Sequence, residues 1–218
     1  MSYFSSTIGR KQMVGVAGLG LSLFVLVHMA GNMLMFIGAE AYNRYAYALT
    51  SSPLIYVAEA GLISIFLLHA VVAIVLTIKN KKARGSNYAV SPKKTSSSFA
   101  AKTMWAQGVI IIGFVILHLN TFKYGTHYDV TYDGVMMRDV FRLMVEVFQN
   151  PVYTFSYFGV LILLGMHLSH GFASSFQTLG LNGAAYDSKV TMAGHVYALL
   201  VTIGFISQPF YIFFIHNA

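Results

Sequence analysis

The sequence predicts an all-α fold, an integral membrane bundle of five transmembrane helices. Composition is the first reason: 56% of the 218 residues are hydrophobic and 10% are charged, whereas soluble domains are about 25% charged. The mean hydropathy of +0.65 agrees. Length is the second reason, because a span needs about 20 mostly apolar residues and five runs are long enough. No run alternates like a barrel strand, so backbone groups must be satisfied within helices.

The five runs are expected to form a single membrane domain over residues 1–218. The first run is too long for the apolar core of a secretory signal and has no convincing cleavage site, so we expect it to remain as a span. Pro209 is expected to kink the last helix. The expected helices are at about 13–37, 55–78, 104–123, 154–176 and 190–214.

Positive charge predicts the orientation of the helices. Residues 79–102 hold seven of the fourteen Lys and Arg residues and no acid. Lys and Arg are enriched in cytoplasmic loops, so we expect the N-terminus in the cytoplasm and the C-terminus outside, in the inner membrane of a bacterium. The connection 38–53 is expected at the outer membrane interface, because it carries Glu40, Arg44 and three tyrosines.

The longest outer connection, residues 125–151, is predicted to contain an amphipathic surface helix. Apolar residues recur at helical spacing from Val135 to Phe148, while Arg138, Asp139, Arg142 and Glu146 take the other positions. Such a helix lies on the membrane or covers a site.

The chain has no cysteine. This excludes disulfides, thiolate-held iron–sulfur clusters and covalently attached c-type haem, whose Cys-x-x-Cys-His signature is absent. Any haem in this chain is therefore a noncovalent b-type haem, and any iron–sulfur centre belongs to a partner chain.

Each of the first four expected helices carries a histidine about 14 residues past its expected start. Successive helices run in opposite directions, so His28 and His118 fall in the outer half of the membrane and His69 and His167 in the inner half. Ionisable residues inside a span mark functional sites, and a six-coordinate haem iron takes two axial ligands. The pattern predicts two bis-histidine haems b, close enough for electrons to cross the membrane.

Several alternatives remain open at these positions. His170 shares a helix face with His167, which we favour because its depth matches the other three histidines. His195 is expected to contact a haem propionate or a partner chain. Taken singly, an intramembrane histidine is also a helix–helix hydrogen-bond partner or a proton relay. The glycines of the first helix serve either close packing or clearance for a flat macrocycle: Gly15, Gly18, Gly20 and Gly31.

Several long segments carry a resemblance to a known family. The run SSTIGRKQMVGVAGLGLSLFVLVHMAGNMLMF, and the run MHLSHGFASSFQTLG followed by HVYALLVTIGFISQPFYIFF, look like the cytochrome b membrane-anchor subunit of succinate dehydrogenases and fumarate reductases. The form resembled is the single-subunit, five-helix, di-haem one, over nearly the whole chain. The resemblance implies two partners on the cytoplasmic side, a flavoprotein subunit and an iron–sulfur subunit. No nucleic acid partner is expected. A dimer of the complex remains possible. The haem ligands it implies are His28, His69, His118 and His167, the four that depth selects.

The resemblance also implies a menaquinone site near the outer haem. Electrons would pass between the partner subunits and membrane menaquinone, while the succinate chemistry belongs to another chain and its direction stays open. A quinone pocket needs an apolar slot with a few polar groups, and our candidates are Glu59, Glu40 and Asn120. Some relatives have a glutamate for proton return two residues before the fourth ligand, where this chain has Gly165, which puts that pathway in doubt.

Two other functions remain as alternatives. A di-haem anchor of a hydrogenase or formate dehydrogenase usually has its catalytic partner outside, whereas the long basic loop here is expected in the cytoplasm. A haem-free transporter would use its histidines to relay protons, but internal repeats and broken helices are not clear in this sequence.

Overall fold

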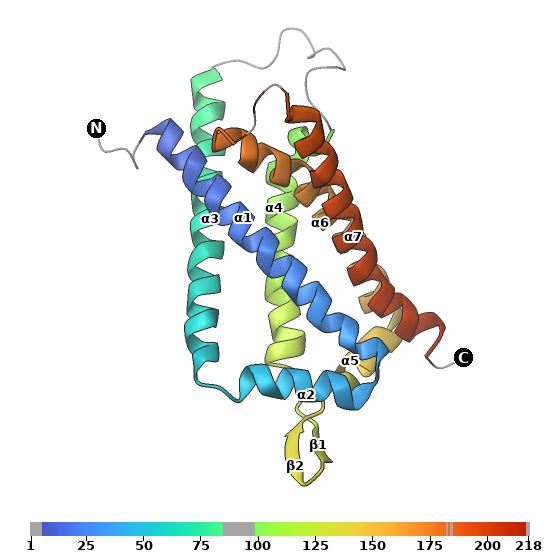
Figure 1. Ribbon diagram of the computed structural model, residues 1–218. Helices are drawn as coiled ribbons and strands as arrows, with labels where there is room; N and C mark the ends of the chain where they lie inside the picture. The colour runs from blue at the N-terminus through green and yellow to red at the C-terminus, as the bar shows by residue number, and fades with distance from the viewer. Residues whose placement is uncertain (1–5, 85–98, 182, 184, 217–218) are drawn as a thin grey trace. The chain divides into compact units, whose positions relative to one another are not determined.

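The structure is a computed structural model that describes residues 6–84, 99–181, 183 and 185–216. Over these residues the chain is mainly helical, and five helices are long and apolar enough to cross a membrane. This confirms the predicted helical class and the five long apolar helices. In chain order (Figure 1) they are α1 (Thr7–Asn32), α3 (Leu54–Arg84), α4 (Phe99–His118), α6 (Pro151–Thr178) and α7 (Asp187–Phe214).

The helices are longer than the apolar runs that predict them. α1 begins at Thr7 rather than at 13, and a 3-10 turn, Met33–Phe36, continues it. α3 continues past 78 to Arg84. Lys and Arg are good helix formers, and cations are favourable near a helix C-terminus, so the first basic residues after the apolar run extend the helix. The rest of the basic loop, residues 85–98, lies outside the described residues.

Most of the connection expected at 38–53 is itself helical. This helix, α2 (Ala39–Thr50), begins after Gly38, whose φ of 141° favours glycine. Glu40 lies in its first turn, where a carboxylate is favourable, and bonds the Arg44 side chain four residues on at 2.7 Å. These signals are local, so α2 was within reach of a sequence-based prediction.

The prediction of a helix from Val135 to Phe148 is wrong for its first residues. Residues Val135–Arg138 form strand β2, which pairs antiparallel with β1 (Asp129–Tyr132). The two turn residues, Asp133 and Gly134, have φ values of 49° and 78°. Asp-Gly is a preferred pair for a two-residue hairpin turn with positive φ at both positions. The turn chemistry therefore prevails over the apparent helical spacing of Val135 and Met136.

The rest of the predicted segment is a helix, α5 (Val140–Gln149). Asp139 caps it, because its carboxylate accepts a hydrogen bond from the Arg142 backbone N–H at 3.0 Å. One face is buried and carries Leu143, Met144 and Phe148, and Arg142 is exposed. The amphipathic character is therefore present, while a position on a membrane surface stays a prediction.

Residue contacts group the chain into two compact units. The first, which we call the basic unit, comprises Met1–Leu23, Gly61–Val109 and Gly165–Leu199. The second, the hairpin unit, comprises Phe24–Ala60, Ile110–Leu164 and Leu200–Ala218. The expectation of a single domain stays a prediction.

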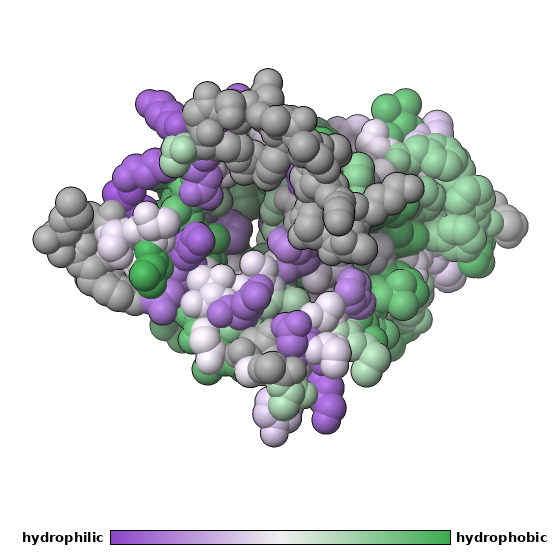
Figure 2. Space-filling view, turned by 90° about the horizontal axis from the view of Figure 1, so that it is seen from above, coloured by the Kyte–Doolittle hydropathy of each residue, from purple (hydrophilic) through white to green (hydrophobic). Residues whose placement is uncertain are grey.

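The basic unit holds most of the positive charge. Its sequence ranges include ten of the fourteen Lys and Arg residues and only one of the seven acids, Asp187. Hydrophilic residues gather on the face of the molecule seen in Figure 2, at the end where α3 stops and α4 begins. Within this unit the Tyr197 hydroxyl on α7 donates to the Ser22 carbonyl on α1 at 2.6 Å. Gly15 lies against the Ser175 backbone, which supports the packing interpretation of this glycine.

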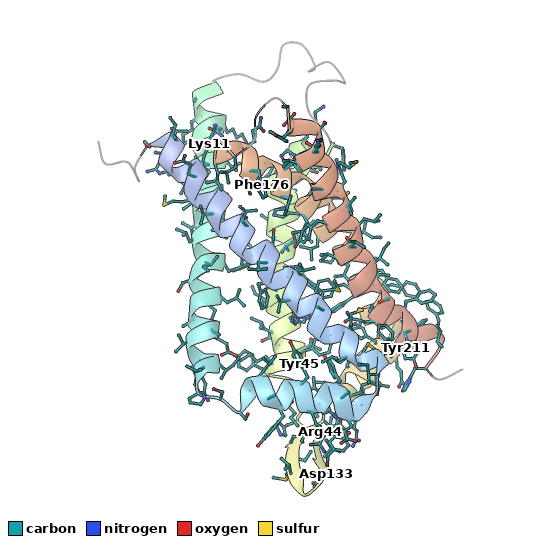
Figure 3. All side chains as sticks on the ribbon, in the orientation of Figure 1. Lys11, Arg44, Tyr45, Asp133, Phe176 and Tyr211 are labelled. Carbon is teal, nitrogen blue, oxygen red and sulfur yellow. The ribbon has the colours of Figure 1, made fainter. Side chains whose placement is uncertain are left out.

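The hairpin unit has an apolar core and six of the seven acids. α2 is anchored to the hairpin segment by Asn43, which is fully buried, donates to the Asp139 carboxylate at 2.8 Å and accepts from the Phe141 backbone N–H at 2.9 Å. Arg44 on α2 also bonds the carboxylate of Asp133 at the hairpin turn (Figure 3). The buried core residues are Met35, Tyr42, Met144, Phe148, Tyr157, Leu161 and Ile212.

Candidate functional site

The four candidate histidines lie in two pairs, one in each unit. In the hairpin unit the ring centroids of His28 on α1 and His118 on α4 are 5.8 Å apart. In the basic unit the rings of His69 on α3 and His167 on α6 are 6.4 Å apart. These are the pairs expected from depth and helix direction. Their role as ligands stays a prediction.

The spacing of each pair suits one metal ion held between two imidazoles. A metal–nitrogen bond is about 2 Å long, and the centre of an imidazole lies about 1.2 Å from its ring atoms, given ring bonds of about 1.3 to 1.4 Å. Two imidazoles on opposite sides of one metal therefore have centroids about 6.4 Å apart, close to both observed separations. The ring planes are steeply inclined in both pairs, by 85° and 72°.

The pair in the hairpin unit is enclosed by aromatic rings. His28 stacks on Phe24 at 5.4 Å between ring centroids. The Tyr157 hydroxyl lies 3.3 Å from His118 Nδ1, and a hydroxyl oxygen accepts a hydrogen bond from an N–H group. Metal-binding histidines usually donate the other ring N–H to such a partner. Three further phenylalanine rings lie within 6 Å of these histidines: Phe114, Phe122 and Phe205.

The π-helix that follows His118 is part of the same unit. It spans Leu119–Lys123 and directly continues α4. π-helical turns are rare and occur frequently at functional sites. This turn places the Lys123 ammonium in a salt bridge with the Glu59 carboxylate of α3, and both side chains are about one-third exposed.

The pair in the basic unit is held by main-chain groups. His69 Nδ1 lies 3.3 Å from the Val14 carbonyl oxygen of α1, so this nitrogen is placed to donate its proton. A Cβ atom added at Gly18 would lie 3.3 Å from His69 Cε1 and 3.5 Å from Ser175 Oγ. Gly18 therefore gives the imidazole its space. His167 Nδ1 is buried and has no hydrogen-bond partner within the described part of the chain.

The spacing of each pair leaves the two imidazoles placed to fit one metal-centred group between them. A buried polar atom that has no partner among the described residues, such as Nδ1 of His167, is uncommon in native proteins, but it is not evidence for a bound group if Nε2 is the ligating nitrogen. In both units the contacts that are present involve Nδ1, at His28, His69 and His118. These three histidines therefore fit a metal-centred cofactor ligated through Nε2, whereas no contact assigns the ligating nitrogen of His167.

The remaining histidines take other positions. His167, rather than His170, has its ring against His69, as the sequence analysis favours. His170 is half-buried and His195 is exposed, and the expected contact of His195 with a propionate or a partner stays a prediction. His216 lies near Phe141, with ring centroids 5.8 Å apart.

The three quinone candidates have different surroundings. Glu59 is paired with Lys123, and Glu40 with Arg44 at 2.7 Å. Glu40 also lines an open pocket of about 500 Å³ at the start of α2. Asn120 is exposed on the π-helix. The structure thus gives Glu59 a cationic partner that the sequence did not indicate, because the partner depends on the π-helical turn.

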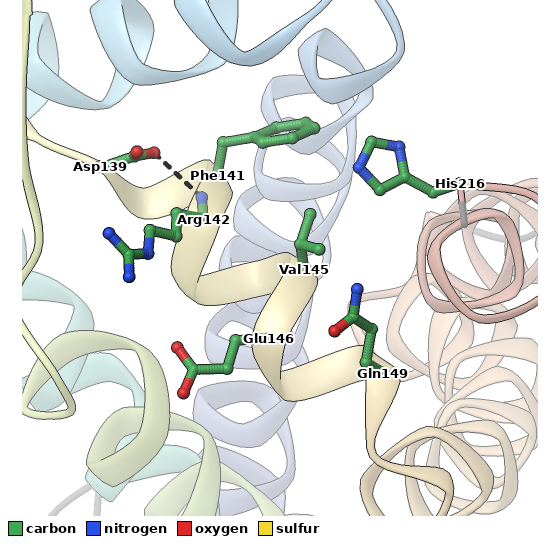
Figure 4. A pocket seen from close by; sticks show the side chains of 7 residues that line it. All are labelled: Asp139, Phe141, Arg142, Val145, Glu146, Gln149 and His216. Carbon is green, nitrogen blue, oxygen red and sulfur yellow. Dashed lines mark hydrogen bonds between the residues drawn. The ribbon is translucent and has the colours of Figure 1, made fainter.

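A second open pocket, of about 530 Å³, lies between α5 and the end of the chain at His216 (Figure 4). Arg142 and Glu146 line it, and both contact Tyr128: the guanidinium lies 4.0 Å from the ring centroid, and the Tyr128 hydroxyl donates to the carboxylate at 2.5 Å. The hydrogen bond to Glu146 raises the pKa of Tyr128. None of the four paired histidines lines this pocket.

Sequence reasoning missed two residues that contact the histidine pair of the hairpin unit, Asn32 and Tyr157, and a third, Tyr42, that bonds Asn32. Asn32 lies four residues after His28 and therefore on the same helix face, a signal that was available. Tyr42 comes from α2, which was not expected, and Tyr157 contacts His118 only because α4 and α6 pack together. Burial raises the pKa of Tyr42, so its hydroxyl stays protonated and able to donate.

No family model, curated protein or solved structure matches this chain.

Proposed function

We propose that this chain is the di-haem b membrane-anchor subunit of a succinate:quinone oxidoreductase, a succinate dehydrogenase or fumarate reductase. The observation that carries the proposal is the pairing of His28 with His118 and of His69 with His167 at the spacing of axial ligands. The resemblance of the sequence to that family supports the same four ligands.

Each haem, when bound, supplies a one-electron couple. In this proposal His28 and His118 hold one haem in the outer half of the membrane, and His69 and His167 hold the other in the inner half. The surrounding apolar helices exclude water from both sites. The polar contacts to Nδ1 orient the imidazoles.

The chain's charged residues have separate roles in the proposal. The basic unit faces the cytoplasm of a bacterium and binds a flavoprotein subunit and an iron–sulfur subunit. Its ten basic residues support this orientation. The hairpin unit lies at the outer side of the inner membrane. There Glu59 passes a proton to menaquinone as it is reduced, or accepts a proton from menaquinol as it is oxidised.

The test is a reduced-minus-oxidised spectrum of the purified chain, with haem quantified per polypeptide. We expect about two haems b in the wild type and about one in each variant His28→Ala, His69→Ala, His118→Ala and His167→Ala. His216→Ala, whose ring lies beside Phe141 rather than beside either pair, is a control that should keep both. A wild type without haem would refute the proposal and favour a proton-relaying transporter.

A second experiment identifies the enzyme. The complex is purified through a tag on this chain, and its partner subunits and succinate:menaquinone reductase activity are measured. A flavoprotein with an iron–sulfur subunit and succinate-dependent activity would support the assignment. A hydrogenase or formate dehydrogenase as the partner would keep the haems and overturn the succinate part.

A further inference from the structure

We propose that Asn32 and Tyr42 are a positioning pair that accepts the Nδ1 proton of His28 and fixes the orientation of its imidazole. The inference rests on the proposed function, because it concerns His28 as a ligand of the haem in the hairpin unit. Both residues lie outside the set that the sequence nominates.

The three residues form a continuous hydrogen-bonded chain from α2 to the ligand. The Tyr42 hydroxyl donates to Asn32 Oδ1 at 2.6 Å. Asn32 Nδ2 donates to the His28 carbonyl oxygen at 2.8 Å and lies 3.5 Å from His28 Nδ1. Tyr42 is only 8% exposed, so water competes little for its hydroxyl.

Coordination through Nε2 changes what Nδ1 requires. A neutral imidazole that binds a metal through Nε2 carries its proton on Nδ1, which becomes a donor and needs an acceptor. In the present orientation Asn32 turns its own donor, Nδ2, toward Nδ1. The amide must therefore offer its oxygen instead when His28 is a ligand.

A half-turn of the Asn32 amide meets this requirement within the same chain. Oδ1 then accepts from His28 Nδ1–H, and Nδ2 donates to the Tyr42 hydroxyl oxygen, because a hydroxyl both donates and accepts. The turn gives up the bond to the His28 carbonyl and gains an acceptor for the imidazole proton. Because Oδ1 would otherwise face that carbonyl oxygen, the amide must also move away from the carbonyl toward Nδ1. Tyr42 keeps a hydrogen bond in both orientations, so it can hold the amide in either one.

α2 offers a matched control for Tyr42. Tyr45 is three residues further along the same helix, and its hydroxyl lies against Gly31, where an added Cβ would be 2.3 Å away. Both tyrosines therefore direct a hydroxyl at α1 next to His28, but only Tyr42 bonds the amide of Asn32. Removing the two hydroxyls one at a time separates loss of this bond from general loss of packing.

The experiment is a redox titration of both haems in the purified complex, for wild type, Asn32→Leu, Tyr42→Phe and Tyr45→Phe. The His28→Ala spectrum identifies which component belongs to the hairpin unit. An acceptor on Nδ1–H makes the imidazole a stronger donor to iron, so its loss should favour the reduced form. For Asn32→Leu we expect about a tenfold shift of the reduction equilibrium toward reduced haem, about 59 mV for a one-electron couple.

Tyr42→Phe should shift the same haem in the same direction by less, and Tyr45→Phe should leave its potential unchanged. The other haem should keep its wild-type potential in all three variants. If Asn32→Leu fails to assemble, Tyr42→Phe alone decides. An unchanged potential in Tyr42→Phe, or equal shifts in Tyr42→Phe and Tyr45→Phe, would overturn the inference while two haems in the wild type still support the proposed function. A wild type without haem would overturn both.

Discussion

The two histidine pairs differ more in their surroundings than in their spacing. The ring centroids are 5.8 Å apart in the hairpin unit and 6.4 Å apart in the basic unit. In the hairpin unit the Nδ1 atoms of His28 and His118 face side chains, Asn32 and Tyr157. In the basic unit His69 Nδ1 faces a main-chain carbonyl.

This difference shows that two histidine pairs of similar spacing can be held in place by two kinds of contact, with side chains or with the main chain. Side-chain partners can be replaced one at a time by substitution, so the surroundings of the pair in the hairpin unit can be changed through single polar groups. The main-chain carbonyl that faces His69 and the space that Gly18 leaves for its ring both depend on how closely the helices pack. The surroundings of the pair in the basic unit are therefore set by helix packing. The acids are also divided unequally, with six of seven in the hairpin unit.

The largest expected effect tests the pairing itself. His28→Ala and His118→Ala should remove the same spectral component, and His69→Ala and His167→Ala should remove the other, because a haem with one axial imidazole is poorly retained. Low-temperature difference spectra resolve the components. His170→Ala should retain both. If the single variants His28→Ala and His69→Ala removed the same spectral component, the two histidines would share a haem and the pairing described here would be wrong.

The next effect concerns the unequal distribution of acids. Glu59→Gln should lower the rate of quinone turnover by about tenfold or more, because an amide cannot exchange the proton, and it should leave the haem spectra unchanged. Asp187→Asn, at the one acid of the basic unit, is the matched control. Steady-state turnover with a menaquinone analogue gives the rates. Normal turnover in Glu59→Gln would remove this carboxylate from the proposed role.

A smaller effect on haem potential should show that His69 is positioned by helix packing rather than by polar side chains. Gly18→Ala places a methyl group 3.3 Å from His69 Cε1, whereas at Gly20 the nearest atom is Ile65 Cγ2 at 3.9 Å. Gly18→Ala should shift the potential of the basic unit's haem by about 30 mV, or about 0.7 kcal/mol for one electron. Gly20→Ala should not. Equal shifts in both haems would mean that the two sites are not tuned separately.

The smallest effect is expected at the exposed ion pair of the hairpin unit. Asp133→Asn removes one of the two carboxylate partners of Arg44, leaves Glu40, and keeps a residue that tolerates positive φ. Exposed ion pairs contribute little and are screened by salt, so the unfolding temperature should fall by at most about 2 °C. Thermal unfolding at low and high salt measures this. A larger fall that salt does not reduce would show that the pair holds the hairpin more firmly than exposure suggests.

The long helices and the histidine pairing were accessible from sequence because they depend on repeated, chain-wide patterns. Apolar runs fix the helices, and the alternation of helix direction sorts the four histidines without knowledge of packing. The ends of the helices were not accessible from hydropathy, because α3 continues through charged residues that favour a helix once it has started.

The hairpin and the partners of the histidines were missed for two different reasons. The Asp133-Gly134 turn is a local signal that was outweighed by a helical reading of the apolar residues beside it. The contact of Tyr157 with His118 has no local signal at all, since the two residues are brought together only by packing of α4 and α6. Tyr42 combines both cases, because its helix could have been predicted and its contact could not.

The length of α3 determines how far the chain can reach into water. Its 31 residues make a rod of about 46 Å, whereas the hydrocarbon layer is about 30 Å thick. In the proposed membrane arrangement, α3 is therefore long enough for its last turns, which carry Lys79, Lys81 and Lys82, to lie outside the apolar layer. A partner subunit that binds there, as the proposed function expects, would meet cations already held on a helix and would avoid the entropic cost of ordering a loop. Its association rate should accordingly depend on ionic strength.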